Sequence, residues 1–173
     1  MIETHETSFT TRSARETTAL GAALGRALEP GDVIARVGDL GAGKTQLVRG
    51  VCEGAAVPER EVASPSFAIV ATYHGRIPVH HADLYRLADE EELHATGFLD
   101  LLGGDGAVLV EWADRIPGAL PAERLEIRLE HLRAASARRV TLRGTGARHA
   151  ALARSLAEGV RRKRDRRRNT ATG

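Results

Sequence analysis

A glycine-rich segment with a single lysine is the part of this 173-residue sequence whose residue types best fit chemistry. It reads Gly38-Asp-Leu-Gly-Ala-Gly-Lys-Thr45 and matches the phosphate-loop pattern G-x-x-x-x-G-K-[ST]. Glycines let backbone N–H groups turn toward a polyphosphate, and the N-terminus of a following helix adds partial positive charge. We therefore expect the whole segment to cradle phosphates: Gly38, Asp39, Leu40, Gly41, Ala42, Gly43, Lys44 and Thr45.

The lysine of this segment stands out against the rest of the chain. Of 25 basic residues only Lys44 and Lys163 are lysines. A compact ammonium suits the β and γ phosphate oxygens better than a guanidinium fork, and the Thr45 hydroxyl can bind Mg²⁺. The alternative is a glycine-rich turn with an incidental lysine, which the match to the full motif disfavours.

A phosphate loop also needs a carboxylate near the metal, usually at the end of a neighbouring strand. Two carboxylates follow strand-like runs, Asp83 after residues 77–82 and Glu111 after residues 108–110. Either of them is a candidate metal ligand or a candidate group for polarising the attacking water. The alternative for each is an ordinary acid at the end of a strand.

Ser64-Pro-Ser-Phe67 lies where nucleotide-dependent switch loops are often found, between the loop helix and the next strand. The hydroxyl of Ser64 or Ser66 can reach a γ-phosphate or its Mg²⁺ from such a position. An equally good interpretation is a turn that Pro65 fixes and Ser64 caps.

Other residues with chemical potential have simpler interpretations. His80 and His81 are adjacent on a predicted strand and point to opposite faces, so one metal ion does not readily take both. Cys52 has apolar neighbours and is interpreted as a small buried hydrophobe. Three arginines are candidates for a charge-stabilising arginine, with solvated surface roles as the alternative: Arg133, Arg138 and Arg139.

Local patterns predict the elements that position the phosphate loop. A capping box at Ser13–Glu16 and apolar residues at helical spacing predict a helix over about 14–28. The β-branched run 33–37 predicts a strand, and the apolar positions of 45–51 predict a helix. The order is strand, glycine-rich loop, helix, which is the context that a phosphate loop requires.

The remaining segments predict a mixed sheet. Residues 67–73 and 77–83 form a hairpin around His74-Gly75-Arg76, and 90–96 is a short helix followed by a loop at 103–106. The apolar run 107–111 is typical of a strand buried on both faces. Strict alternation in 124–130 predicts a half-exposed antiparallel strand, 139–143 repeats it, and 147 to about 162 is helix-prone.

Length and charge bound the organisation of the chain. The length fits one domain, expected over residues 1–160, and residues 161–168 hold seven basic residues and one acidic residue. The rest carries 18 basic and 22 acidic residues, so the net charge of +2 reflects a basic, disordered tail expected over 161–173. The tail is a candidate for non-specific RNA contact or for a solubilising role.

The apolar content excludes a membrane protein, because no run approaches the roughly 18 apolar residues that a spanning helix needs. The N-terminus lacks the basic and apolar regions of a secretory signal, and the single cysteine allows no internal disulfide. We expect a cytoplasmic protein.

Four elements in this order resemble the TsaE family of bacterial ATPases required for threonylcarbamoyladenosine synthesis on tRNA. They are the phosphate loop, Ser64-Pro-Ser-Phe67, His81-Ala-Asp-Leu-Tyr-Arg-Leu87 and Glu111-Trp112. The similarity runs from about residue 13 to 142. It implies an α/β, P-loop NTPase-like three-layer domain with a mixed, mostly parallel sheet and an antiparallel hairpin.

The resemblance also implies roles for single residues. ATP would bind to the phosphate loop, Thr45 and Glu111 would hold Mg²⁺, and Asp83 would be needed for hydrolysis. Trp112 would lie close to the nucleotide. Thr17 of the first helix would also approach the nucleotide, an implication that rests on a less specific match to the family. Ser66 stands where the family typically has threonine, so the hydroxyl is kept and altered switch packing is expected.

The partners that the resemblance implies are TsaD, which transfers the threonylcarbamoyl group to adenosine of tRNA, and TsaB. ATP turnover, slow in the isolated chain, would reset their complex, and tRNA would be met indirectly. One alternative is a small-molecule P-loop kinase, although no arginine-bearing lid is evident after Glu111. Another is a nucleotide-gated RNA-binding module, which depends on the basic tail alone.

Overall fold

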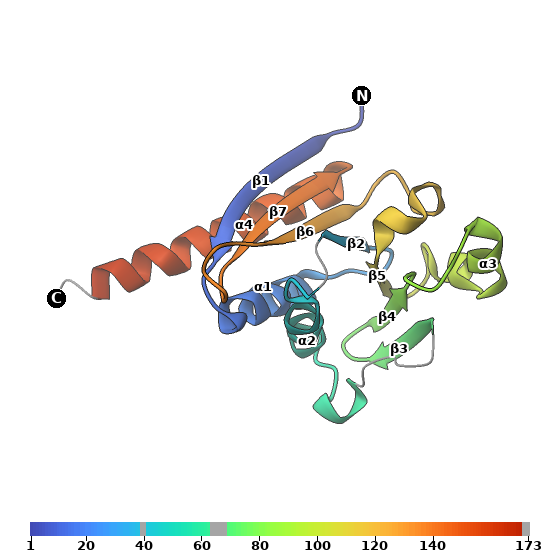
Figure 1. Ribbon diagram of the computed structural model, residues 1–173, viewed down its shortest axis with the longest axis horizontal. Helices are drawn as coiled ribbons and strands as arrows, with labels where there is room; N and C mark the ends of the chain where they lie inside the picture. Colours follow the sequence, from blue (N-terminus) through green and yellow to red (C-terminus); the bar gives the residue numbers. More distant parts are fainter. Residues whose placement is uncertain (39–40, 63–68, 171–173) are drawn as a thin grey trace.

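A mixed seven-stranded sheet forms the centre of the molecule in the computed structural model, which describes residues 1–38, 41–62 and 69–170 and, at Lys44, the backbone alone. Figure 1 shows the sheet with helices packed against it. Its order is β1-β7-β6-β2-β5-β4-β3. The strands are β1 (Thr4–Thr11), β2 (Val33–Gly38), β3 (Val70–His74), β4 (Pro78–Asp83), β5 (Ala107–Glu111), β6 (Leu125–His131) and β7 (Arg138–Thr145).

The four central strands, β6, β2, β5 and β4, run parallel, and the strands at both sides pair antiparallel. β2 and β5 are buried along almost their whole length, as expected for apolar strands covered on both faces. β6 alternates between buried and more exposed residues, so its predicted half-exposed character is confirmed. It is antiparallel to β7 and also parallel to β2, which local sequence does not reveal.

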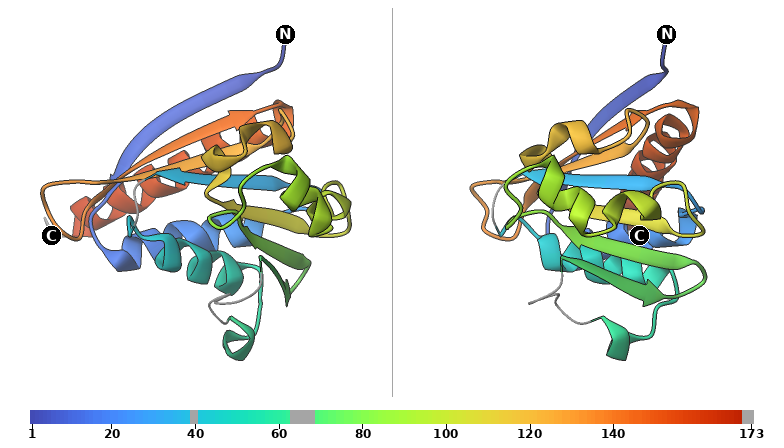
Figure 2. Two further views of the ribbon diagram at one scale, coloured as in Figure 1. Left: turned by 45° about the vertical axis from the view of Figure 1, so that its right-hand side comes forward. Right: turned by 90° about the vertical axis from the view of Figure 1, so that its right-hand side faces the viewer.

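Helices cover the two faces of the sheet unequally. The helices α1 (Ala14–Ala27), α2 (Lys44–Gly54) and α4 (Ala147–Thr170) share the larger apolar core on one face. The short helix α3 (Glu90–Ala95) and three of the 3₁₀ turns, Phe98–Leu101, Ala113–Arg115 and Pro117–Ala119, cover the other face around Phe98 and Leu93. Figure 2 shows α3 on the side of the sheet opposite to α1 and α2. The predicted three-layer α/β domain is confirmed.

The C-terminal helix is longer than the sequence predicts. The sequence predicts a helix only to about residue 162 and a disordered tail over 161–173, but α4 continues to Thr170 and projects past the sheet in Figure 1. Arginine and lysine are good helix formers, and two side chains tie this part to the domain: Arg164 donates to the Thr10 carbonyl, and Arg167 lies 3.1 Å from Glu16. Despite its length α4 is polar, and among the described helices none is apolar enough over a sufficient length to cross a membrane.

Helices α1 and α2 approach each other closely because glycines face one another at their contact. A methyl group placed on Gly21 would lie 2.3 Å from the Leu47 carbonyl oxygen, and one placed on Gly50 would lie 2.1 Å from that of Thr18. Gly25 and Gly54 repeat the arrangement one turn further along. The i, i+4 spacing in both helices lets their backbones touch, and this contact sets the position of α2 and therefore of the phosphate loop.

Alanine substitution should have opposite effects at two helical glycines. Gly50→Ala is expected to lower the free energy of unfolding by about 1–3 kcal/mol, because the new methyl group overlaps the backbone of α1. Gly159→Ala in α4 is the matched control, where a methyl group meets nothing within 4 Å, and there a gain of about 1 kcal/mol is expected. Urea unfolding of both variants measures the difference. An unchanged Gly50→Ala stability would contradict the close packing.

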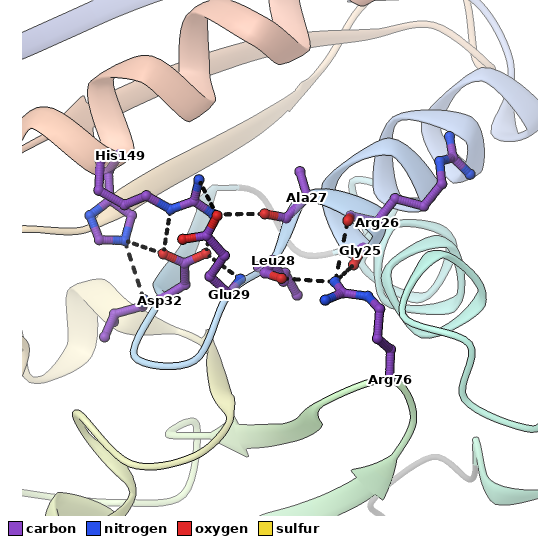
Figure 3. Close-up of polar contacts among 10 residues, drawn as sticks. Gly25, Arg26, Ala27, Leu28, Glu29, Asp32, Arg76 and His149 are labelled. Carbon is purple, nitrogen blue, oxygen red and sulfur yellow. Dashed lines mark hydrogen bonds and ion pairs between the residues drawn. The ribbon is translucent and has the colours of Figure 1, made fainter.

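Two polar clusters fasten the end of α1 and the start of α4 to neighbouring elements (Figure 3). Arg76, in the turn of the β3–β4 hairpin, donates to the carbonyls of Gly25, Arg26 and Leu28 and so caps the end of α1. The second cluster is centred on the buried Asp32, which takes a bidentate contact from Arg148 of α4 at 3.0 and 2.7 Å. These bonds join the hairpin, α1, β2 and α4 into one unit.

His149 completes the second cluster as a neutral side chain. Its Nε2 accepts from the Val33 amide at 3.4 Å, and burial lowers the pKa of the ring. Its 3.5 Å approach to Asp32 is therefore a polar contact and not an ion pair at neutral pH. Arg148 carries the charge that balances Asp32, and the hydrogen bond between them raises the pKa of the guanidinium.

Candidate functional site

The phosphate loop connects the end of β2 to the start of α2, as predicted. Gly38 is the last residue of β2, and Gly43 precedes α2 with φ +94°, a left-handed conformation that glycine adopts without strain. No described side chain caps the first turn of α2, and the uncapped N-terminus of a helix is suited to binding an anion. Asp39 and Leu40 lie outside the described residues, as does the side chain of Lys44.

The two threonines predicted near the nucleotide have different surroundings. Thr45 is exposed in the first turn of α2, where its hydroxyl is accessible to a ligand. Thr17 is 1% exposed and its Oγ1 lies 2.9 Å from that of Thr11, while its methyl group would lie 3.6 Å from a methyl group placed on Gly43. Thr17 is thus a buried residue that packs close to Gly43 of the phosphate loop.

Three charged residues lie in register across the parallel strands at the edge where the loop emerges. Glu111 on β5 is opposite Arg36 on β2 and opposite Asp83 on β4. Parallel strands end at the same edge of a sheet, and side chains at equivalent positions share one face. The two candidate carboxylates are therefore neighbours, on the face that α2 covers.

Glu111 is the centre of a buried polar cluster. Its side chain is 0% exposed, and its Oε2 lies 3.1 Å from Nη1 of Arg36, which is 2% exposed. Nε2 of His81 lies 3.4 Å from the other oxygen, Oε1, without hydrogen-bond geometry. Among the described residues, Glu111 Oε1 and both ring nitrogens of His81 have no hydrogen-bond partner. A buried carboxylate oxygen of this kind is suited to a cation or an ordered water.

Asp83 is more accessible than Glu111. It is half-buried at the end of β4, and its Oδ1 accepts from the Tyr85 amide at 3.0 Å. The amide of Leu84, the residue between Asp83 and Tyr85, donates to the Glu111 carbonyl at 3.1 Å. These two bonds fix the backbone around Asp83 relative to β5, so the carboxylate has a defined place at the mouth of the site.

Trp112 follows Glu111 directly but packs on the other side of the sheet. It adopts φ +57° and belongs to the core around α3, with its ring 5.0 Å from that of Tyr85. The Arg115 guanidinium lies 5.6 Å from the Tyr85 ring, which is exposed. The predicted contact of Trp112 with a nucleotide stays a prediction.

The chemistry of the donor set fits Mg²⁺. The described residues contain no group of three or more His, Cys, Asp or Glu side chains placed to hold a metal. Mg²⁺ in nucleotide sites commonly takes only one or two protein ligands and otherwise binds phosphate and water. The exposed Thr45 hydroxyl and Glu111 Oε1, which has no hydrogen-bond partner among the described residues, are metal-ligand oxygens of the required kind.

The other candidates are only partly described. Ser64 and Ser66, predicted as switch residues, lie outside the described residues. His80 contacts Thr72 at 2.9 Å while His81 faces Glu111, which confirms that the two histidines point to opposite faces. Cys52 is fully buried, and burial raises its pKa to about 11, in agreement with a structural role.

The three candidate arginines differ in their surroundings. Arg138 donates to the carbonyls of Ala135 and Ala137 and so stabilises the β6–β7 turn. Arg133 and Arg139 are exposed, and the turn they flank lies at the edge of the sheet where β2 ends, because Gly38 pairs with Leu129. A role in stabilising charge stays a prediction.

Arg36 was missed by sequence reasoning, which treated residues 33–37 as a β-branched strand and gave its arginine no role. The available signal is a charged residue inside an otherwise apolar run. Such a residue requires a buried partner, because an unpaired charge in the core is costly.

Comparison with known proteins identifies the family of the chain. The family model described as "Threonylcarbamoyl adenosine biosynthesis protein TsaE" matches residues 11–140. The chain belongs to the TsaE family. The resemblance indicated by the phosphate loop, the HxDLYRL element and Glu111-Trp112 is thereby confirmed. Helix α4 lies beyond the residues that the TsaE family model matches.

Individual relatives agree with this assignment. The TsaE protein of Treponema pallidum is 40% identical over 121 residues, covering 70% of this chain and 89% of the relative. That of Bacillus subtilis is 42% identical over 118 residues, covering 68% and 73%. Both are named as tRNA threonylcarbamoyladenosine biosynthesis proteins.

A solved structure extends the similarity to the fold. The crystal structure of Bacillus subtilis YdiB matches with a TM-score of 0.74 at 31% identity and covers 92% of this chain and 97% of its own. This agrees with a P-loop NTPase-like α/β fold.

Proposed function

We propose that this chain is a Mg²⁺-dependent ATPase that supports threonylcarbamoyladenosine modification of tRNA by acting on a complex of TsaD and TsaB. One observation carries the proposal: a complete phosphate-loop motif opens α2 beside two carboxylates that lie in register at the same edge of the sheet. Membership of the TsaE family supplies the process in which the activity is used.

In this proposal the side chains divide the work. Backbone N–H groups at the start of α2 and the Lys44 ammonium bind the phosphates, and Thr45 with Glu111 would hold Mg²⁺. Bound Mg²⁺ would neutralise charge on the β and γ phosphate oxygens. Arg36 holds the Glu111 carboxylate in place, and the more accessible Asp83 orients the attacking water. A partner that completes the site would speed an otherwise slow hydrolysis.

The test is to follow the terminal phosphate of ATP. The purified chain is incubated with Mg·ATP, with and without the TsaD and TsaB homologues of its source. We expect free inorganic phosphate, released faster when the partners are present, and less threonylcarbamoyladenosine in tRNA when the chain is removed from the reconstituted system. Phosphate transferred to an organic acceptor would instead indicate a small-molecule kinase.

A further inference from the structure

A groove lies between α1 and the C-terminal half of α4, apart from the phosphate-loop residues. Its volume is about 610 Å³, and both helices contribute to its walls. The whole of α4, including the half that forms one wall, lies past the residues matched by the family model.

The floor of the groove is apolar and made of small or aliphatic side chains. Its central residues are Ala19, Leu20, Ala23, Leu156, Gly159 and Val160. A methyl group placed on Gly159 would meet nothing within 4 Å, so the floor has room at this point. None of the described residues that line the groove is aromatic.

The rim of the groove is strongly basic. Seven arginine and lysine residues line it, and Glu16 is the single acidic residue among the described lining residues. Glu16 already contacts Arg167 at 3.1 Å and accepts from the Arg12 amide at 2.8 Å. Lys163 and Arg166 are exposed on the side of α4 that borders the groove.

The basic rim is attached to the domain. Arg164 donates to the Thr10 carbonyl at the end of β1, and Arg167 pairs with Glu16 of α1. These contacts hold the end of α4 against α1 before any ligand arrives. A preformed groove loses less conformational freedom on binding than a flexible tail would.

We propose that this groove binds an acidic amphipathic segment of a partner protein. An amphipathic helix places apolar side chains on one face and carboxylates at its flanks, which matches an apolar floor between basic walls. The phosphates of a single-stranded nucleic acid would pair with the basic rim, but its bases would find no aromatic side chain in the floor. Proteins that bind single strands commonly stack the bases on aromatic side chains. The surface is additional to the proposed ATPase site, and its test requires no nucleotide.

The experiment measures binding of labelled probes to the full chain by fluorescence anisotropy. The probe is a synthetic peptide of about four helical turns with leucine on one face and glutamate on the other. Polyglutamate of the same length and oligouridylate RNA are the comparisons. We expect the amphipathic peptide to bind at least about tenfold more tightly than either, because only it fills the apolar floor.

Two pairs of variants test the floor and the rim separately. Gly159→Leu fills the floor and should weaken peptide binding about tenfold, whereas Gly159→Ala should bind like the wild type. Lys163→Glu with Arg166→Glu should weaken it by a similar factor of about ten. Arg161→Glu with Arg168→Glu makes the same charge change on the same helix outside the groove and should have a smaller effect.

Two results would overturn the proposal. Equal binding of polyglutamate or oligouridylate would show a general polyanion or RNA surface, and peptide binding unchanged by Gly159→Leu would show that the groove is not used. Thermal melting verifies that each variant is folded. If Gly159→Leu does not fold, the two charge-reversal pairs decide, and equal losses in both pairs would reject the groove.

Discussion

Replacing Lys44 with alanine is expected to weaken ATP binding by about a hundredfold or more. The ammonium is the only positively charged side chain of the phosphate loop and therefore the only one that attracts the phosphates, since Asp39 is acidic and the remaining residues are uncharged. Backbone N–H groups at the start of α2 would remain, so a weak residual affinity is consistent with the site. Fluorescent-nucleotide titration measures the loss.

The chain provides its own control for this experiment. Lys163 is its only other lysine, lies on α4 and borders the basic groove, so Lys163→Ala changes the net charge equally without touching the loop. Lys163→Ala should bind ATP like the wild type. Lys44→Arg should bind poorly, because a guanidinium fork does not fit where a compact ammonium does. An ATP affinity unchanged in Lys44→Ala would refute the phosphate-loop interpretation.

The central strands and the phosphate loop could be predicted because their signals are local. The apolar run 107–111 and the β-branched run 33–37 are each long enough to identify a buried strand, and the loop motif requires a strand before it and a helix after it. The hairpin formed by β3 and β4 also follows from local turn chemistry. Residues 67 and 68 of the predicted first strand lie outside the described residues.

The first strand could not be predicted in the same way. β1 contains Phe9 as its only large apolar side chain, among threonines and charged residues. An edge strand pairs on one side only and has one face toward the core, so it needs few apolar residues to stay in place. Its threonines carry β-propensity, but the partner β7 lies more than a hundred residues away in the sequence.

The helical tail shows a different limit of composition. A run of seven basic residues predicts repulsion and disorder, but those residues also favour the helix, and α4 already has a buried start at Leu152 and Leu156. Contacts from Arg164 and Arg167 to β1 and α1 depend on the fold and not on local sequence.

The Arg36–Glu111 pair shows why the candidate site could be predicted only in part. Glu111 ends one predicted strand and Arg36 lies inside another, but their pairing requires β2 and β5, which are distant in the sequence, to be neighbours in the sheet. Residue patterns therefore found two carboxylates without a way to distinguish them, and only the family resemblance implied a different role for each. The structure separates them by burial, since Glu111 is enclosed with Arg36 and His81 and Asp83 stays at the surface of the site.

This difference in burial leads to a test that separates the two carboxylates. Asp83→Asn removes the charge of the accessible residue but keeps its shape, and we expect ATP affinity to be retained while hydrolysis falls by about a hundredfold or more. Glu111→Gln replaces a carboxylate paired with Arg36, and we expect a higher Mg²⁺ concentration to be needed for the same hydrolysis rate. Phosphate release is measured with the chain in excess over ATP, so that slow turnover is still detected.

Controls for this last experiment address folding and charge. Asp100→Asn removes an exposed carboxylate on the far side of the sheet and should change neither the rate of hydrolysis nor the Mg²⁺ concentration required. Glu111→Gln leaves the Arg36 guanidinium facing a neutral amide in the core, so a lower melting temperature is expected for this variant and is measured separately from the Mg²⁺ titration. The opposite outcome would be that Asp83→Asn raises the Mg²⁺ concentration required and that Glu111→Gln abolishes turnover even at saturating Mg²⁺. The two roles would then be exchanged, because extra Mg²⁺ can compensate only for the loss of the residue that binds the metal.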